Sequence, residues 1–288
     1  MINRDIYDSM LNDAAKATKH SLNISNKPVL GVVLGTGLNK SVKLENSIHF
    51  PLKDLKCFES LYHLKGHPRE LVYGYINGIP MLTLNGRIHL NELPGDNVEQ
   101  GLMVRMQIEI MIKLGIKMLI TTCAAGSLST TKNIQVGDVV LIDGFLSLFT
   151  PAMPHFVGEF VSPENILANN LGPLVKKIAD QNIKKPRKTV AGIYAMLRGP
   201  QFEGIKVDKR ALATMGADCV GMSVYPECSI AALHKISTIA LAFITNDDKA
   251  KHSHEKNLKT MLNLEEQNSN FLTQLATKLA DTAQRVCL

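Results

Sequence analysis

At 288 residues the chain is long enough to bury a substantial core as one large domain or two small ones. With 45% hydrophobic and 20% charged residues, its composition is that of an ordinary globular protein and excludes a disordered chain. The formal net charge of +6 would suit a nucleic-acid partner, but the basic residues are dispersed apart from 184–188, aromatic residues are sparse and tryptophan is absent. That cluster is better explained as a solvated loop, so we expect no nucleic-acid partner.

No apolar run approaches the length of a bilayer-spanning helix, and residues 1–23 carry acids from Asp5 onward without the apolar centre of a secretory signal. We therefore expect a cytoplasmic protein without membrane contact. The five cysteines are odd in number and scattered, and no two of them form a CxxC pair. This pattern argues against a disulfide framework and a zinc site, so we expect reduced thiols in packed positions.

The N-terminal part predicts a helix, a buried strand and a glycine-containing turn. Apolar residues at four-residue steps indicate an amphipathic helix over 2–22, and the apolar run 28–34 has strand length. This run leads directly into GTGL at 35–38, which leaves backbone N–H groups and a threonine hydroxyl free to face an anion. The turn is neither a dinucleotide fingerprint nor a Walker A loop, because Lys40 and Asn39 occupy required glycine positions. A phosphate nest and a plain tight turn both fit.

The segment 71–84 predicts a β-hairpin, because the Asn-Gly pair at 77–78 tolerates the positive φ of a tight turn. Its second arm leads into Arg87 and His89, which point to one side of an extended chain while Ile88 points to the other. An arginine and a histidine projecting together would suit a dianion. Standing alone, the pair would instead be read as a solvated strand end.

His63 and His67 lie four residues apart but do not predict a metal site. Gly66 and Pro68 flank His67 and oppose the continuous helix that would bring both imidazoles onto one face. We therefore expect no metal ion at this pair.

Helical and strand patterns alternate through the middle of the chain. Residues 96–114 have helical spacing, a polar start and a closing glycine. The strand 117–122 leads into small residues at 123–127, where a flat ring or a phosphate can approach the backbone closely. A further buried strand is expected at 137–143. Residues 144–162 are loop-like and contain four phenylalanines that would be costly to expose, so we expect a lid or a subunit contact there.

Helical spacing returns at 163–182 and again at 258–287. Between these helices, three apolar runs stop at small or polar residues, at 198–203, 221–223 and 245–246. Ligands of open α/β sheets gather at such strand ends.

The alternation of strands and helices, without an internal repeat or a linker, predicts one α/β domain over residues 1–288 with a largely parallel or mixed sheet.

Seven short motifs then define a resemblance. They are GTGL at 35–38, GH at 66–67, GRIH at 86–89, TCAAGSL at 122–128, GPxFE at 199–203, VGMSxxPE at 220–227 and ITN at 244–246. In this order and at these intervals, from about residue 28 to 280, the chain resembles the trimeric class of purine nucleoside phosphorylases, in the family that also includes methylthioadenosine phosphorylases.

The resemblance implies a fold and a reaction. The family fold is a single α/β domain whose mixed sheet is partly closed into a barrel, surrounded by helices and assembled as a homotrimer. The reaction is reversible phosphorolysis, in which a purine (deoxy)nucleoside and inorganic phosphate give the free base and (deoxy)ribose 1-phosphate in purine salvage. Phosphate is a co-substrate, and the family uses neither a metal nor an organic cofactor.

The resemblance also implies a site, residue by residue. Hydroxyls, N–H groups and one fixed cation would bind the phosphate dianion, which agrees with the physical properties of such donors. The phosphate contacts carry over to Thr36, His67, Arg87, His89, the Ala124 backbone and Ser223; the ribose contacts to Met222, His89 and His254; and the base contacts to Phe202, Glu203, Ala124, Ala125, Val220 and Asn246.

Glu203, Asn246 and His89 carry the expected catalysis, and the first two give the sharpest expectation about the substrate. As the glycosidic bond breaks, the sugar becomes cationic and the purine becomes negative, so the Asn246 amide would donate to purine N7. Glu203 would accept from the N1–H of a 6-oxopurine, which favours inosine and guanosine. Aspartate in place of Asn246 would instead accept from a 6-amino group, as methylthioadenosine phosphorylases do.

Departures from the family pattern leave alternatives open. Thr36 replaces a serine and keeps its hydroxyl, Cys123 replaces an asparagine, and Asn91 replaces an aromatic ribose contact. Phe156 is assigned as the aromatic that reaches a neighbouring subunit's ribose. The segments 253–254 and 265–268 also resemble the inosine/xanthosine-type bacterial branch. The alternatives are therefore a xanthosine-accepting phosphorylase, a methylthioadenosine phosphorylase and a nucleoside-binding protein without catalysis.

Overall fold

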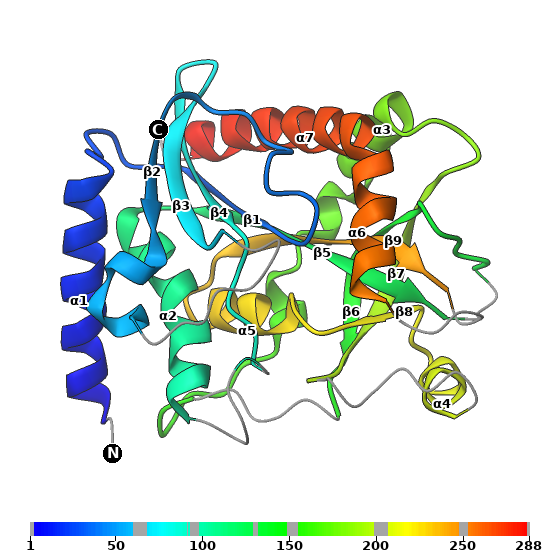
Figure 1. Ribbon diagram of the computed structural model, residues 1–288, viewed down its shortest axis with the longest axis horizontal. Coiled ribbons are helices and arrows are strands. Elements are labelled where there is room, and N and C mark those ends of the chain that lie inside the picture. The colour runs from blue at the N-terminus through cyan, green and yellow to red at the C-terminus, as the bar shows by residue number, and fades with distance from the viewer. Residues whose placement is uncertain are drawn as a thin grey trace.

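A computed structural model describes residues 3–59, 68–90, 92, 98–128, 132–148, 155–198, 207–247 and 253–286. Its strands form one mixed sheet with the order β2-β3-β4-β1-β5-β8-β7-β6-β9, in which β9 also pairs with β5 (Figure 1). The strands are β1 (Leu30–Leu34), β2 (Glu45–Pro51), β3 (Glu70–Ile76), β4 (Ile79–Asn85), β5 (Met118–Ser127), β6 (Val139–Leu146), β7 (Thr189–Met196), β8 (Cys219–Gly221) and β9 (Ser237–Asn246).

The pairing of β9 with β5 closes part of the sheet into a barrel. The ring runs β5-β8-β7-β6-β9 and back to β5, while β1, β4, β3 and β2 extend from β5 as an open wing. Parallel ladders join β1 to β4 and β5, β5 to β9, β6 to β7, and β7 to β8, whereas β5 meets β8 and β6 meets β9 antiparallel. The predicted α/β class with a mixed, partly closed sheet is confirmed.

Helices cover both faces of the sheet, as Figure 1 shows. They are α1 (Arg4–Ser21), α2 (Val98–Leu114), α3 (Gly172–Asn182), α4 (Asp208–Thr214), α5 (Tyr225–Leu233), α6 (His254–Asn263) and α7 (Glu265–Val286). One core contains side chains from α1, α2 and α5, and a second contains side chains from α3, α6 and α7. Strand β1 supplies both, with Val33 in the first and Leu30, Val32 and Leu34 in the second. Burial on both faces explains why its sequence is apolar throughout.

Several sequence expectations agree with the fold. The hairpin is β3–β4, and its turn residues Asn77 and Gly78 have φ values of 50° and 77°. Among the residues described, Cys57, Cys123, Cys219 and Cys228 are free thiols. No helix in the described ranges has both the length and the apolarity needed to cross a membrane.

Three element boundaries were predicted wrongly. The strand expected to end at 122 continues through the small residues to Ser127, because β9 pairs with it along this length. The helix expected over 163–182 begins only at Gly172, since Leu167 forms a parallel bridge to Thr238 of β9 and the residues around Leu167 form 3₁₀ turns. The single helix expected over 258–287 breaks at Leu264 into α6 and α7, which point in different directions (Figure 1).

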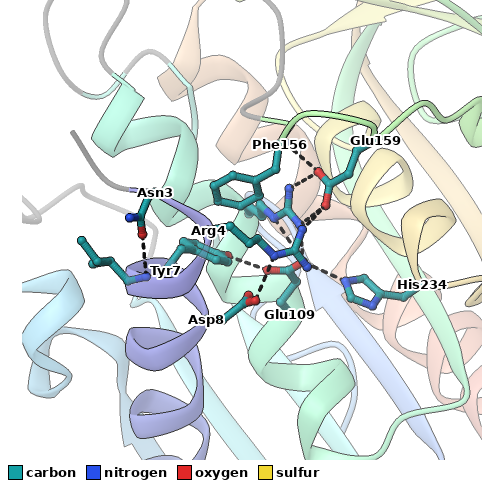
Figure 2. Close-up of polar contacts among 10 residues, drawn as sticks. Asn3, Arg4, Tyr7, Asp8, Glu109, Phe156, Glu159 and His234 are labelled. Atoms are coloured by element: carbon teal, nitrogen blue, oxygen red, sulfur yellow. Dashed lines mark hydrogen bonds and ion pairs between the residues drawn. The ribbon is translucent and has the colours of Figure 1, made fainter.

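A network of charged side chains fixes residues 155–160 to α1 and α2, as Figure 2 shows. Glu159 accepts hydrogen bonds from Arg4 at 2.6 Å and from two nitrogens of Arg105 at 2.6 and 2.9 Å. Arg105 also donates to Glu109, which accepts from the Tyr7 hydroxyl at 2.6 Å. The network thereby joins three segments that are far apart in the sequence.

The same network includes Phe156. Its ring packs against Tyr7 with a centroid distance of 5.4 Å, and the guanidinium groups of Arg4 and Arg105 lie 5.0 and 4.9 Å from its centroid. Cation–π contact and partial burial therefore hold this ring against α1 and α2 of its own chain. In the same segment, Phe160 is 95% exposed.

Glu159→Gln should destabilise the protein in a pH-dependent way. Burial alone would raise the pKa of Glu159, but hydrogen bonds from Arg105 and the Phe156 N–H lower it from 4.5 to about 2. A depressed pKa stabilises the fold above pH 4.5 and loses that effect as the pH falls toward 2. We expect a loss of about 2 kcal/mol at pH 7 that falls to roughly half at pH 3 and largely disappears only near pH 2, measured by thermal unfolding at pH 7 and pH 3.

Asp180→Asn is the matched control, because Asp180 forms an exposed pair with Lys176 on α3. Its effect should stay within about 0.5 kcal/mol at both pH values. An equal loss at pH 7 and pH 3 for Glu159→Gln would contradict the assigned role.

Candidate active site

Strand β5 changes its neighbour at the site. Strand β1 pairs with it as far as Thr121, and β8 pairs with it from Gly126 onward. Residues 122–125 between these ladders have no strand partner on that edge among the described strands, although β9 pairs with the other edge. Predicted phosphate, ribose and base residues lie around this gap, on the turn after β1, the segment after β4, and the ends of β8 and β9.

The turn after β1 packs closely onto this edge. The Gly35 N–H donates to Thr122 Oγ1 at 3.1 Å, and the Thr122 hydroxyl donates to the Val33 carbonyl at 2.9 Å. A Cβ atom at Gly35 would lie 2.8 Å from the Thr122 carbonyl oxygen and 3.1 Å from Arg87 Nη2, so only glycine allows this approach. The neighbouring Thr36 is half-buried beside the gap.

Arg87 reaches the same place from the end of β4. Its Nη2 donates to the Thr122 carbonyl oxygen, and its Nη1 donates to Glu227 Oε1 at 2.6 Å. Arg87 and Glu227 are both 1% exposed. The structure therefore brings Arg87 beside the turn that contains Thr36, as the sequence predicted.

Ser223 lies just before α5, the helix that contains Arg87's partner Glu227. The Tyr225 N–H donates to the Ser223 carbonyl oxygen at 2.9 Å, and the intervening Val224 has φ 71° and ψ −52°. These values describe a γ-turn with positive φ, a strained conformation that is rare for a β-branched residue. Such strain persists where the surrounding structure enforces it, commonly at functional sites.

Tyr194 and Cys123 lie beneath Ser223. The Tyr194 hydroxyl accepts from the Ser223 N–H at 3.3 Å, and a Cβ atom at Gly221 would lie 2.3 Å from that hydroxyl. The Cys123 thiol lies close to Tyr194 and Ser223, and burial raises its pKa to about 12. Cys123 is therefore a neutral thiol in the floor of the site.

His89 has a different partner from Arg87. Its Nδ1 lies 3.0 Å from Glu92 Oε1, which also accepts from the His89 backbone N–H at 2.8 Å. Glu92 Oε2 accepts from Arg69 Nη2 at 2.6 Å. The sequence suggested that Arg87 and His89 act as one pair, but each contacts a different carboxylate. Glu227 contacts Arg87, and Glu92 contacts His89.

Two of the predicted base residues, Asn246 and Val220, lie in one row across the barrel. Asn246 on β9 is opposite Gly126 on β5, Gly126 is opposite Val220 on β8, and Val220 is opposite Ala195 on β7. A Cβ atom at Gly126 would lie 2.9 Å from the Asn246 amide nitrogen, so glycine provides the space for this side chain. Beyond Asn246, the Asp247 carbonyl accepts from the buried Lys209 ammonium at 2.7 Å, which ties α4 to the end of β9.

The remaining predicted residues divide into two groups. Ala124 and Ala125 lie on β5 within the gap, and half-buried Met222 lies between β8 and Ser223. The following lie outside the described residues or, for His254, outside the described side chains: His67, Asn91, Phe202, Glu203 and His254. Where side chains are described, no cluster of three or more His, Cys, Asp or Glu residues could hold a metal ion.

Sequence reasoning missed four residues that shape the site: Tyr194, Gly126, Glu92 and Glu227. Tyr194 had one usable signal, a lone aromatic near the carboxyl end of an apolar strand. Glu227 was part of a quoted motif but had no assigned role, because its partner Arg87 lies 140 positions away in the sequence. Gly126 depends on β5 and β9 lying side by side, which no local pattern reports.

Comparisons with known proteins identify the family to which the chain belongs. The model of the phosphorylase superfamily matches residues 29–279. Purine nucleoside phosphorylase 1 of Bacillus subtilis is 30% identical over 232 residues, which cover 78% of this chain and 81% of the relative. The bovine purine nucleoside phosphorylase is 28% identical over 279 residues, covering 90% and 91% of the two chains.

A solved structure is similar along nearly its whole length. Isoform 2 of the Schistosoma mansoni purine nucleoside phosphorylase, in complex with cytosine and ribose-1-phosphate, has a TM-score of 0.79 and 26% identity. The match covers 94% of this chain and 96% of that one.

The partly closed mixed sheet and the site beside β5 thus define a nucleoside phosphorylase fold. The chain belongs to the phosphorylase superfamily. Within it, the chain is similar to the purine nucleoside phosphorylases and is a pentosyltransferase.

Gly126→Ala should impair catalysis without unfolding the protein. The added methyl group would displace the Asn246 amide, and a displacement of about 1 Å can lower turnover by about 100-fold. We expect kcat for purine nucleosides to fall by about 10- to 100-fold, measured by the release of free base. Gly172→Ala is the control, because its nearest contact would be an ordinary 3.5 Å to Leu141. Equal activities of the two variants would contradict a role for the Gly126 approach.

Proposed function

We propose that the enzyme catalyses reversible phosphorolysis of 6-oxopurine (deoxy)nucleosides, chiefly inosine and guanosine. The products are the free base and (deoxy)ribose 1-phosphate, and the role is purine salvage. One observation carries the proposal. The buried Arg87 cluster and the Asn246 row both adjoin β5, at Thr122 and at Gly126. These positions are roughly 13 Å apart along an extended strand, which leaves space for a sugar between an anion and a base.

Phosphate binds, in this proposal, at the Arg87 end. Thr36 and Ser223 offer hydroxyl groups, Arg87 a fixed guanidinium and Ala124 a backbone N–H, with His67 and His89 completing the set. The position of Arg87 among Gly35, Thr122 and Glu227 supports this assignment. Neutral donors around one fixed cation suit a dianion that must also leave as part of a product.

Bond exchange takes place at the sugar carbon C1′. The C1′–N9 bond breaks as a phosphate oxygen forms the new C1′–O bond, and the bonding electron pair leaves with the purine. The adjacent phosphate stabilises the oxocarbenium-like sugar, while Met222, His89 and His254 contact the ribose. His89 is oriented by Glu92, since both its Nδ1 and its backbone N–H meet the same carboxylate oxygen.

Asn246 and Glu203 select the base in this proposal. The Asn246 amide donates to N7, where negative charge develops, and Glu203 accepts from N1–H. Phe202, Val220 and Ala125 pack against the purine ring. A base that lacks the N1 proton would leave the Glu203 carboxylate unpaired, at a cost of about 1–3 kcal/mol.

Inorganic phosphate is the co-substrate, and we propose that the reaction needs no metal ion or organic cofactor. We further propose a cytoplasmic homotrimer. Phe160 and Val157, 95% and 108% exposed, support a subunit contact on this segment, because a fixed loop presents two apolar side chains to solvent.

A substrate panel tests the proposed specificity. Purified protein is incubated with inosine, guanosine, xanthosine, adenosine or methylthioadenosine, with and without phosphate, and base release is followed. We expect phosphate-dependent release chiefly from inosine and guanosine. Release chiefly from xanthosine would favour the xanthosine-accepting phosphorylase that the segments 253–254 and 265–268 resemble. Release chiefly from methylthioadenosine would overturn the role of Asn246, and phosphate-independent release from all five would overturn phosphorolysis.

Asn246→Asp should weaken turnover of 6-oxopurine nucleosides. The new carboxylate cannot donate to N7 and would repel the developing negative charge, so kcat/KM for inosine should fall by about 100-fold, as when one oxyanion donor is lost. The measurement is steady-state kinetics with inosine and adenosine at saturating phosphate. An unchanged inosine kcat/KM would remove Asn246 from the mechanism. Asn182→Asp on α3 serves as the control, because it lies outside the site.

A further inference from the structure

Glu227 is a buried carboxylate whose partner is the predicted phosphate-binding cation. We propose that Glu227 is a positioning residue, which orients the Arg87 guanidinium toward the phosphate subsite without touching the substrate itself. The inference rests on the proposed function and adds to it a residue that determines how phosphate is held.

Among the described residues, three contacts hold the Arg87 guanidinium. Nη1 donates to Glu227 Oε1 at 2.6 Å and lies 3.5 Å from Thr121 Oγ1, and Nη2 donates to the Thr122 carbonyl oxygen. A guanidinium is a planar fork of five N–H donors, so fixing both terminal nitrogens fixes the directions of the remaining donors. Of these three contacts, only the one to Glu227 is an ion pair.

The location of Glu227 couples Arg87 to Ser223. Glu227 is the third residue of α5, and Ser223 lies just before that helix, across the strained turn at Val224. The start of a single helix therefore determines where the Ser223 hydroxyl and the Arg87 cation lie relative to each other. Both are expected phosphate ligands.

The energetics of Glu227 argue against a purely stabilising role. Its side chain is 2% exposed and that of Arg87 is 1% exposed, so both charges are desolvated, and such pairs contribute little net stability. In addition, the second oxygen, Oε2, is buried without a hydrogen-bond partner among the described residues. An unpaired buried acceptor costs free energy, which indicates that this carboxylate serves to orient Arg87.

Two variants separate the effect of the Glu227 side-chain length from the effect of its charge. Glu227→Gln keeps an acceptor oxygen at the same distance but removes the charge, whereas Glu227→Asp keeps the charge but shortens the side chain by one methylene. If Glu227 positions Arg87, the phosphate KM of Glu227→Asp should rise by about 10-fold, and that of Glu227→Gln should stay within about threefold of wild type. The nucleoside KM should change by less than about twofold in both.

Glu109→Gln provides the matched control. Glu109 is also a 2% exposed carboxylate paired with a 1% exposed arginine, Arg105. Both residues belong to α2 and contact α1 and residues 155–160, outside the site. Its loss should lower the temperature of unfolding and leave the phosphate KM unchanged. A phosphate KM in Glu227→Asp that moves no more than in Glu109→Gln would overturn the proposal, as would a larger rise in Glu227→Gln than in Glu227→Asp.

Direct binding of inorganic phosphate, measured by calorimetry without nucleoside, separates this inference from the proposed function. If the wild type binds phosphate but cleaves no nucleoside, the proposed reaction fails, while the Kd values of the Glu227 variants still decide the positioning role. We expect the Kd to follow the same order, with Glu227→Asp about 10-fold weaker than wild type. Absence of phosphate binding by the wild type would overturn both proposals.

Discussion

The exchange of neighbours along β5 is the constraint on which the site depends. Strand β5 leaves β1 after Thr121 and meets β8 at Gly126, so one edge opens where barrel and wing join. The opening requires glycine at two positions, because Gly35 packs against the backbone of β5 and Gly126 faces the Asn246 side chain. A side chain at Gly35 would push the turn after β1 away, and one at Gly126 would displace the Asn246 amide. Gly35 and Gly126 are thus structural requirements of this edge.

Much of the fold could be predicted from local sequence patterns, because these patterns depend only on neighbouring residues. The Asn-Gly turn, the doubly buried strand β1 and the glycine turn after it follow from backbone preference and burial. The errors arose where tertiary contacts override local pattern. Pairing with β9 extends β5 beyond its predicted end, and the bridge from Leu167 to Thr238 replaces a predicted helical turn. Alternating strands and helices could predict a mixed sheet but could not predict the β5–β9 ladder that closes it.

The site was predictable to the extent that motifs identify single residues. Thr36, Arg87, Ser223, Val220 and Asn246 were chosen from motifs, and the fold brings them to one region around β5. What the sequence could not provide is the set of partners, because each partner is distant in the chain: Glu227 for Arg87, Tyr194 for Ser223 and Gly126 for Asn246. The two buried arginines illustrate the difference. Arg105 ties secondary-structure elements together, whereas Arg87 is held beside an open strand edge, yet both read simply as arginine in a sequence.

The strained turn at Val224 affects the entropy of ligand binding. Its backbone lies in a region that β-branched residues avoid, at a cost of about 1–3 kcal/mol that the folding of the whole domain must offset. In return, the turn, the Tyr194 hydroxyl and the start of α5 already fix the backbone of Ser223. At the proposed phosphate site, this residue would therefore lose little conformational entropy when the anion binds, because its rigidity is acquired during folding.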